Sequence, residues 1–307
     1  MKIISKYIGI IFIVMISLNS YSQQEPLYTQ YYNNFSLINP AYAGSHGYFT
    51  NTFSVRSQWV DEPGSPKTKA MSVHGATGKN VGLGLSVVND KVFVLNETHV
   101  YADFSYSIKA SENATLAFGL KAGASFLNVD LLGLEIYDDP LFNQNISKTN
   151  PNIGVGAFFF TDRFYASLST MNILKNTHFK RKNNIVSSAS ENMVYYLSSG
   201  YVFDLGKELK LKPSFLVRGV KGSPVSTDVA VNLLWKVAEF GISHRFKESI
   251  SGLFQIRLND SLKLGYTYSG YTQNIGNYNS GSHEVSLIFD INKKSNHISR
   301  SKVPFNW

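Results

Sequence analysis

Apolar and polar residues alternate with a period of two along most of this chain. At residues 209–218, Leu209, Leu211, Phe215 and Val217 fall on one face, and lysine, serine and arginine side chains fall on the other. Such alternation is typical of β-strands with one face in apolar surroundings. The pattern predicts fourteen strands, at residues 49–59, 67–77, 80–91, 96–109, 114–128, 151–160, 163–171, 193–205, 209–220, 226–236, 237–246, 249–259, 261–270 and 282–291.

The predicted strands are long, and their connections alternate in length. They average near the ~9 to 11 residues that a tilted transmembrane strand needs, against ~5 to 6 in soluble sheets. Short turns at 78–79, 110–113, 161–162, 206–208 and 259–261 alternate with long connections at 60–66, 129–150, 172–192, 221–225 and 271–281. We therefore predict an all-β fold, a transmembrane antiparallel up-and-down β-barrel with both ends in the periplasm. The connections at 92–95, 236–237 and 247–248 are so short that the strand boundaries there are ambiguous. The predicted number of strands is therefore about 12 to 16.

The composition supports a sheet that faces hydrocarbon. Charged residues make up 16% of the chain, against about 25% in a typical globular domain, while aromatic residues reach 14%. With no cysteine, a cysteine-linked lipid anchor, a disulfide scaffold and thiolate chemistry are all excluded. Beyond residue 22 the 27 basic and 21 acidic residues leave a scattered excess of six positive charges, so we expect no nucleic-acid partner.

The first residues have the pattern of an export signal. Lys2 and Lys6 precede an apolar run at 7–18, and Ser20 and Ser22 suit a cleavage site before Gln23. We predict a signal peptide at 1–22 and an outer-membrane destination. The alternative, a retained membrane anchor, would need roughly 18 to 20 apolar residues.

A single domain follows the signal peptide. We expect an N-terminal segment at 23–48, the barrel at 49–291 and a basic periplasmic tail at 292–307. Within the segment, Pro40 directs Asn39 toward extended geometry and Gly44 permits a tight bend. These features suit a compact entry that lies in the lumen as a plug. A flexible terminus is the alternative.

Several motifs, in a fixed order, carry a family resemblance. They are Pro26-Leu27-Tyr28-Thr29-Gln30-Tyr31-Tyr32, Asn39-Pro40-Ala41-Tyr42-Ala43-Gly44, Arg56-Ser57-Gln58-Trp59 with a Pro-Gly-Ser-Pro loop, Asn80-Val81-Gly82-Leu83-Gly84, and Gly281-Ser282-His283-Glu284-Val285. Together they resemble the PorP/SprF family over essentially the whole mature chain. The resemblance implies an outer-membrane barrel of the type IX secretion system of Bacteroidota, without catalytic residues.

The resemblance leaves two roles open. Some family members are core components that touch the periplasmic ring subunits. Others are partners of secreted gliding adhesins, which they help export or retain at the surface through the C-terminal signal domain of the adhesin. We expect a secreted protein of this kind as the partner, with the periplasmic ring subunits as a second candidate. Outer-membrane lipid should surround the barrel.

The residues themselves give no sign of catalysis. His283-Glu284 begins like a zinc-protease motif, but the second histidine is missing, and the seven histidines are dispersed without ligand spacing. No Gly-x-Ser-x-Gly elbow or phosphate-binding loop occurs. We predict no enzyme, no metal and no cofactor. The pairs Gly82/Gly84 and Gly154/Gly156 lie inside predicted strands, where glycine marks a bulge or close packing.

Two long outer connections and the tail are candidates for partner contact. The 129–150 connection combines acidic and apolar residues, and a surface loop of this length is more often functional than filler. The 172–192 connection carries a small basic cluster suited to lipopolysaccharide or an acidic partner. A solvated loop and a disordered tail are the alternatives. Our partner-binding candidates are Asn39, Pro40, Tyr42, Gly44, Trp59, Glu135, Tyr137, Asp138, Asp139, Lys180, Arg181 and Trp307.

Two other functions compete with this hypothesis. A barrel similar to the fatty-acid transporters, which also have an Asn-Pro-Ala segment in an N-terminal hatch, would need an apolar tunnel. The inward positions predicted here instead carry Lys, Arg, Asp and Ser. A lipid-modifying enzyme would need a Ser/His or His/Asp constellation on neighbouring strands, and the sequence offers no such pair.

Overall fold

The computed structural model describes residues 31–136, 142–174, 192–273, 276 and 279–291. The strands are β1 (Phe49–Ser57), β2 (Lys67–Gly78), β3 (Val81–Val92), β4 (Leu95–Ser111), β5 (Ala114–Val129), β6 (Ile146–Phe160), β7 (Phe164–Met171), β8 (Val194–Tyr201), β9 (Phe203–Asp204), β10 (Leu209–Val220), β11 (Ser226–Trp235), β12 (Ala238–Arg245), β13 (Ser249–Arg257), β14 (Leu262–Tyr271) and β15 (Ser282–Ile291). Three short 3-10 helices accompany them: η1 (Tyr31–Leu37), η2 (Pro40–Tyr42) and η3 (Leu132–Leu134).

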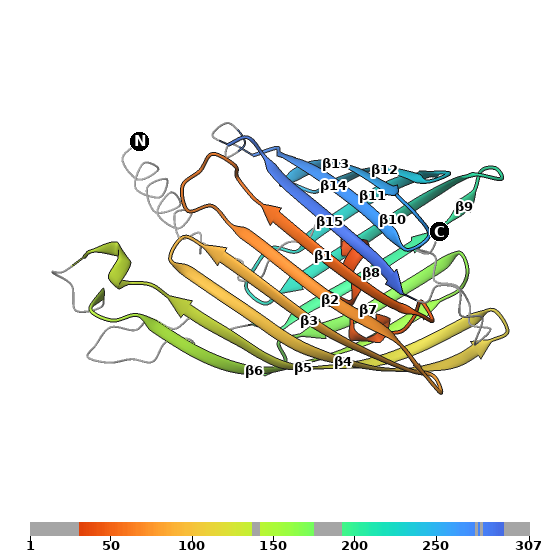
Figure 1. Ribbon diagram of the computed structural model, residues 1–307, viewed down its shortest axis with the longest axis horizontal. Helices are drawn as coiled ribbons and strands as arrows, with labels where there is room; N and C mark the ends of the chain where they lie inside the picture. The colour runs from red at the N-terminus through yellow and green to blue at the C-terminus, as the bar shows by residue number, and fades with distance from the viewer. Residues whose placement is uncertain (1–30, 137–141, 175–191, 274–275, 277–278, 292–307) are drawn as a thin grey trace, which may run out of the picture.

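The strands form one closed antiparallel barrel (Figure 1). Each strand pairs with its neighbours in the chain, and β15 pairs with β1 to close the circle. Because β8 and β9 both pair with β10 and are separated only by Val202, they act as one interrupted strand. The barrel therefore has fourteen strands, and the predicted fold class is confirmed.

Most predicted strand boundaries agree with the structure within one or two residues, and the largest error is at the start of β6. The strand predicted at 151–160 begins at Ile146, because residues 146–150 continue the ladder with β5, from Val129 opposite Ile146 onward. Their outward-facing members are Ser147 and Thr149, so this end of β6 lacks the apolar face that the prediction depended on. The connection between β5 and β6 is accordingly 130–145 rather than 129–150.

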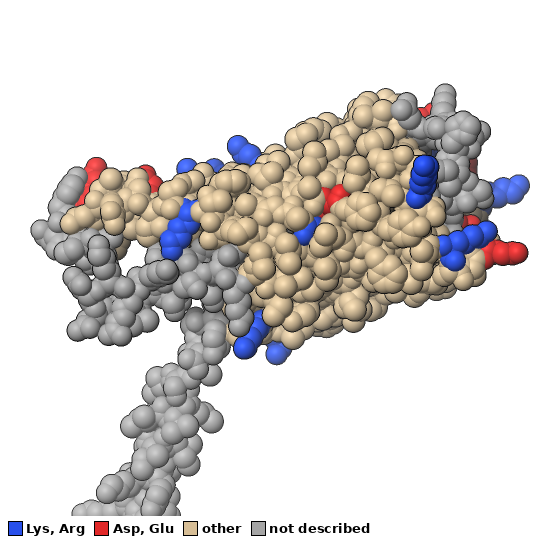
Figure 2. Space-filling view, turned by 90° about the horizontal axis from the view of Figure 1, so that it is seen from below, with Lys and Arg blue, Asp and Glu red and all other residues tan. Residues whose placement is uncertain are grey.

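The two faces of the sheet have opposite chemistry. On β11, Val229, Val231 and Leu233 are exposed on the outside, while Asn232 is 1% exposed and faces the lumen. Charged side chains lie mostly toward the two ends of the barrel, and other residues dominate the band between them (Figure 2). An apolar outside around a polar inside is the arrangement expected of a barrel embedded in lipid.

The two ends of the barrel differ. At the end where β1 begins and β15 ends, two-residue turns connect several strands. In one of them Lys79 and Asn80 have φ of 46° and 67°, as such tight hairpins require. At the opposite end most connections are longer, with the two-residue β3–β4 turn at 93–94 as an exception. The hairpin of β5 and β6 extends beyond the others (Figure 1). Short turns mark the periplasmic end of such barrels and longer loops the outer end. No helix in the described ranges is long and apolar enough to span a membrane.

Candidate functional site

The N-terminal residues 31–48, here called the lumen segment, lie inside the barrel (Figure 1). Helix η1 contacts β2, and η2 contacts β4, β5 and β6. Tyr31, Phe35, Asn39 and Tyr42 are each at most 2% exposed. The Asn-Pro-Ala-Tyr-Ala-Gly motif therefore lies inside the lumen, against the part of the wall that β4, β5 and β6 form.

Three glycines of the wall make room for the lumen segment. A Cβ on Gly82 of β3 would overlap the Ala43 carbonyl group, and one on Gly119 of β5 would overlap the backbone of Ala41. A Cβ on Gly156 of β6 would overlap the Asn39 side chain. These glycines thus serve close packing, as predicted for glycines inside strands, and they explain two of the Gly-containing sequence motifs.

Hydrogen bonds within the lumen segment, and between it and the wall, satisfy its buried polar groups. Asn39 extends before η2, and its side-chain oxygen accepts a bond of 2.9 Å from the Ala41 N–H. Its side-chain amide donates to Oγ of Ser167 at 2.7 Å and to the carbonyl oxygen of Ala157. In the opposite direction, Ser169 Oγ of the wall donates to the Ile38 carbonyl oxygen of the segment. Because buried backbone groups need partners, these small polar wall residues hold the segment in one register.

An aromatic cluster fixes the apolar side of the lumen segment. The Phe35 ring lies 5.5 Å from Phe158 and 5.8 Å from Tyr165, measured between ring centroids. Tyr42 lies 5.3 Å from Phe158. The Tyr31 hydroxyl donates to Oγ of Ser214 on β10, and burial raises the pKa of this hydroxyl to about 12. Rings at these separations attract each other beyond simple burial.

A chain of hydrogen bonds joins the lumen segment to the closure of the barrel. The Tyr42 hydroxyl lies 2.7 Å from Nε2 of His46, and Nδ1 of His46 lies 2.9 Å from Oγ1 of Thr50 on β1. Thr50 Oγ1 in turn donates to Asp290 of β15 at 2.9 Å. The segment is therefore connected both to the first strand and to the last one.

Ion pairs line much of the remaining wall. Among the described residues, five pairs join buried cationic and acidic side chains: Arg56–Glu284, Lys121–Asp103, Lys212–Glu239, Arg245–Asp228 and Lys263–Asp290. Separations run from 2.6 Å for Arg245–Asp228 to 3.9 Å for Lys263–Asp290. Pairing offsets the large cost of taking each charge out of water. The Lys, Arg, Asp and Ser expected on inward faces thus face the lumen.

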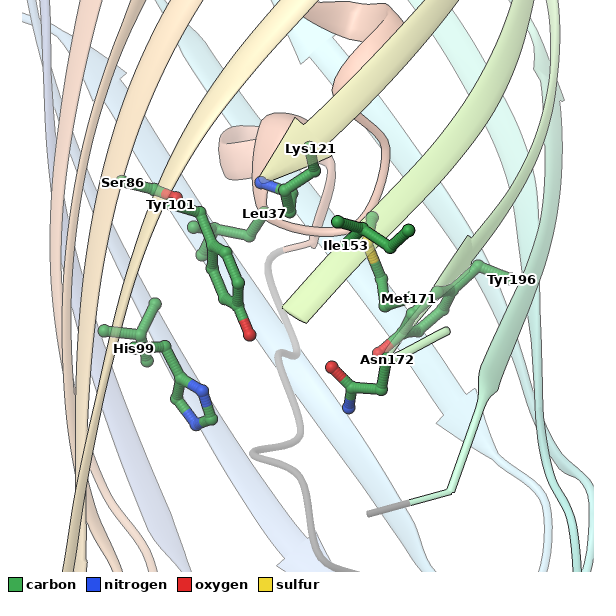
Figure 3. A pocket seen from close by; sticks show the side chains of 10 residues that line it. Leu37, Ser86, His99, Tyr101, Lys121, Ile153, Met171, Asn172 and Tyr196 are labelled. Carbon is green, nitrogen blue, oxygen red and sulfur yellow. The ribbon is translucent and has the colours of Figure 1, made fainter. Parts of the chain in front are cut away.

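A pocket opens beside η1 (Figure 3). It is lined by Leu37, Ser86, Val88, His99, Tyr101, Lys121, Ile153, Met171, Asn172 and Tyr196. Lys121 pairs with Asp103 at 2.7 Å, which offsets its charge. The buried Ser86 hydroxyl has no hydrogen-bond partner in the described part of the chain.

The outer end of the barrel is uneven in height. Strands β4, β5 and β6 have 17, 16 and 15 residues, whereas β12 to β15 on the opposite side have 8 to 10. Residues 130–136 continue this tall side outward and include η3. Leu132 and Ile136 are 53% and 43% exposed there. Asn145 Oδ1 accepts from the Leu132 N–H at 2.9 Å, which orders the base of the connection.

The predicted partner-binding residues fall in different places. Asn39, Pro40, Tyr42 and Gly44 lie together in the lumen, while Glu135 lies exposed on the tall side, with φ of 54°. Partner binding by these residues stays a prediction. The candidates Tyr137, Asp138, Asp139, Lys180, Arg181 and Trp307 lie outside the described residues.

Trp59 connects two outer loops. Its backbone N–H donates to Oγ of Ser282 at 3.3 Å, and its ring centroid lies 6.2 Å from that of Tyr271. Val60 then donates to the Gly281 carbonyl oxygen at 2.9 Å. The residue therefore ties the β1–β2 connection to the β14–β15 connection.

Sequence reasoning missed the residues that receive the lumen segment. Ser105, Ser167 and Ser169 have ordinary strand positions, and only the presence of the segment in the lumen gives them a role. The small residues of β3, β5 and β6 could have indicated that another segment packs closely against these strands. Within the described residues no three His, Asp or Glu side chains come together as a metal site would need.

Known structures similar to this chain include outer-membrane proteins. The Acinetobacter baumannii protein Omp33 is 11% identical over 80% of this chain and 100% of its own, with a TM-score of 0.46. A Pseudomonas aeruginosa FadL homologue is 13% identical, over 82% and 92% of the two chains, with a TM-score of 0.46. The Ralstonia pickettii toluene transporter TbuX is 10% identical, over 82% and 91%, with a TM-score of 0.48.

Comparison at the sequence level gives a family. No curated protein matches the chain significantly. The family model described as type IX secretion system membrane protein PorP/SprF matches residues 20–289, which include the lumen segment and nearly the whole barrel. The resemblance carried by the sequence motifs is thereby confirmed. The chain belongs to the PorP/SprF family of type IX secretion system membrane proteins.

Proposed function

We propose that this chain is a non-enzymatic binding barrel of the type IX secretion system. It binds a secreted protein, such as a gliding adhesin, through the C-terminal signal domain of that protein and helps to export it or retain it at the surface. The observation that carries the proposal is the lumen segment, which occupies the barrel with its own aromatic cluster and hydrogen bonds. A barrel filled in this way acts as a platform rather than as the conduit for a large protein.

The tall outer side supports binding at the outer face. The connection 130–145 presents exposed Leu132 and Ile136 beside the acidic Glu135. Apolar anchors within a polar rim are typical of protein interfaces. A partner with apolar side chains and a basic fringe would fit this surface. Arrival in the outer membrane would follow removal of the predicted signal peptide at 1–22.

Contact with periplasmic ring subunits is the second role within the same proposal. The periplasmic end presents charged turn residues such as Lys79, Glu112 and Asp162. Both roles are compatible with a filled lumen, because neither requires a large protein to pass through this barrel.

The proposal is tested by comparing the secreted and surface proteins of a deletion strain with those of the complemented strain. Loss of one or a few large secreted proteins from the surface or medium is the expected result, with other secreted proteins unchanged. General loss of type IX secretion would favour the core role. An unchanged set of secreted proteins, with impaired uptake of a hydrophobic compound, would instead support the alternative of a barrel similar to fatty-acid transporters. The pocket beside η1, with Leu37, Ile153 and Met171 in its lining, is the feature that favours this alternative.

A further inference from the structure

The connection between β9 and β10 forms a fixed projection at the periplasmic end of the barrel (Figure 1). The Leu205 N–H donates to the Leu209 carbonyl oxygen at 2.9 Å and closes the turn. The Lys236 N–H donates to the Glu208 carbonyl oxygen at 3.1 Å. The second bond ties the projection to the neighbouring β11–β12 turn, so the two turns hold a constant separation.

A groove lies between this projection and the barrel wall. Its lining combines turn residues 205–209 with Leu233, Trp235 and Phe240 of β11 and β12. Leu233 and Trp235 alternate with the lumen-facing Asn232 and Leu234, and they therefore point outward to lipid. Most of the outer wall is a sheet surface that lipid touches from one side. Here the projection adds a second apolar side, with Leu205 56% exposed and Trp235 54% exposed.

The rim of the groove has a positive excess. Arg163, Lys207, Lys210 and Lys236 give four positive charges against three negative charges from Asp162, Asp204 and Glu208, a difference of one. Arg163 and Lys210 approach Asp204 at 2.8 and 3.7 Å, and Lys236 approaches Glu208 at 3.3 Å. Lys207 has no carboxylate within ion-pair distance in the described ranges.

We propose that this groove binds one phospholipid of the periplasmic leaflet. An acyl chain lies between Leu205 and the Trp235 and Phe240 rings, and the phosphate lies at Lys207 and Lys236. Three features lead to this ligand: the groove opens to the hydrocarbon region, its rim lies at headgroup depth at the end of the barrel, and its excess charge is positive. Aromatic and basic residues at this depth are typical of membrane interfaces. The site is independent of the proposed secretion role.

The test is native mass spectrometry of the full-length protein released from mild detergent after reconstitution with phosphatidylglycerol or phosphatidylethanolamine. The groove variant is Lys207→Gln combined with Trp235→Ala; both side chains are exposed, so the fold should persist. The matched control is Lys109→Gln combined with Phe104→Ala, which removes an exposed lysine and an exposed aromatic residue from β4. Heat-modifiable migration on gels checks that every variant is folded.

The wild type and the control should retain one phospholipid per barrel, and the groove variant should retain at least about five-fold less. Equal retention by the groove variant and the control would overturn the proposal, because lipid would then bind without regard to the groove. Removal of the lipid by millimolar inorganic phosphate would also overturn it, since the site would then recognise phosphate alone. If the double variant does not fold, Lys207→Glu alone supplies the same comparison by reversing the rim charge.

Discussion

The side-chain amide of Asn39 donates a hydrogen bond of 2.7 Å to Oγ of Ser167, and this contact helps to join the lumen segment to β7. Asn39 has three such bonds in all, because it also donates to the Ala157 carbonyl oxygen and accepts from the Ala41 N–H. Asn39, Ala41 and Ser167 are buried, so a bond lost among them leaves its partner without water as a substitute. Asn39 is thus the residue on which the register of the segment most depends.

We expect Asn39→Ala to loosen the lumen segment without unfolding the barrel. The cost should be about 1–3 kcal/mol, since the variant leaves buried donors and acceptors unpaired. Hydrogen exchange followed by mass spectrometry should show faster exchange in peptides that cover residues 39–44, and unchanged exchange in peptides from β12 and β13. Asn39→Asp keeps the acceptor for Ala41 but places a buried carboxylate oxygen against the Ala157 carbonyl oxygen, so it should loosen the segment at least as much as Asn39→Ala. Equal protection in all three proteins would contradict this role.

Gly119→Val should displace the segment outright. A Cβ at Gly119 would overlap the Ala41 backbone, and backbone cannot move aside as a flexible side chain can. Limited proteolysis within residues 31–48 and ion current in planar bilayers should both increase relative to the wild type. The control is Gly252→Val, because a Cβ at Gly252 meets no atom within 4 Å. Identical behaviour of the two variants would show that the segment does not depend on the space at Gly119.

The buried pair of Arg245 and Asp228 should be coupled strongly. Arg245 uses Nε and one terminal nitrogen to reach both oxygens of Asp228, at 2.6 and 2.9 Å. Arg245→Met alone strands a buried carboxylate and should lower the free energy of unfolding by about 3–5 kcal/mol. The double variant Arg245→Met with Asp228→Asn should recover a large part of that loss. Urea unfolding in detergent measures the free energy of unfolding of each variant. If the two substitutions lowered it additively, the pairing would be contradicted.

The sequence could predict the barrel because each strand carries its own local signal. Lipid on one side demands apolar residues at alternate positions, and this demand lapses near the outer ends of strands, as at Lys67 and Lys69 of β2 and at Ser147 and Thr149 of β6. The lumen could not be predicted in the same way. Its ion pairs join residues such as Arg56 and Glu284, and the role of Gly156 depends on Asn39 lying opposite. Such relationships exist only after the barrel has closed.

The connection 130–145 should carry partner binding. Exchange of these residues for a short Gly/Ser connection should leave insertion intact, because β5 and β6 still pair from Val129 and Ile146 down, and should reduce partner recovery at least about ten-fold. Exchange of the connection at 221–225 is the control. Insertion is checked by heat-modifiable migration on gels. Unchanged recovery with the 130–145 exchange would refute this assignment and direct attention to the other outer connections.

The most direct measurement is recovery of this protein from its native outer membrane in mild detergent, with a tag in the 221–225 connection and mass spectrometry of what accompanies it. The account predicts a very large secreted protein, or periplasmic secretion subunits, in amounts comparable to the barrel. A barrel that carries only fatty acid or another small hydrophobic molecule would contradict the account and establish the transporter instead.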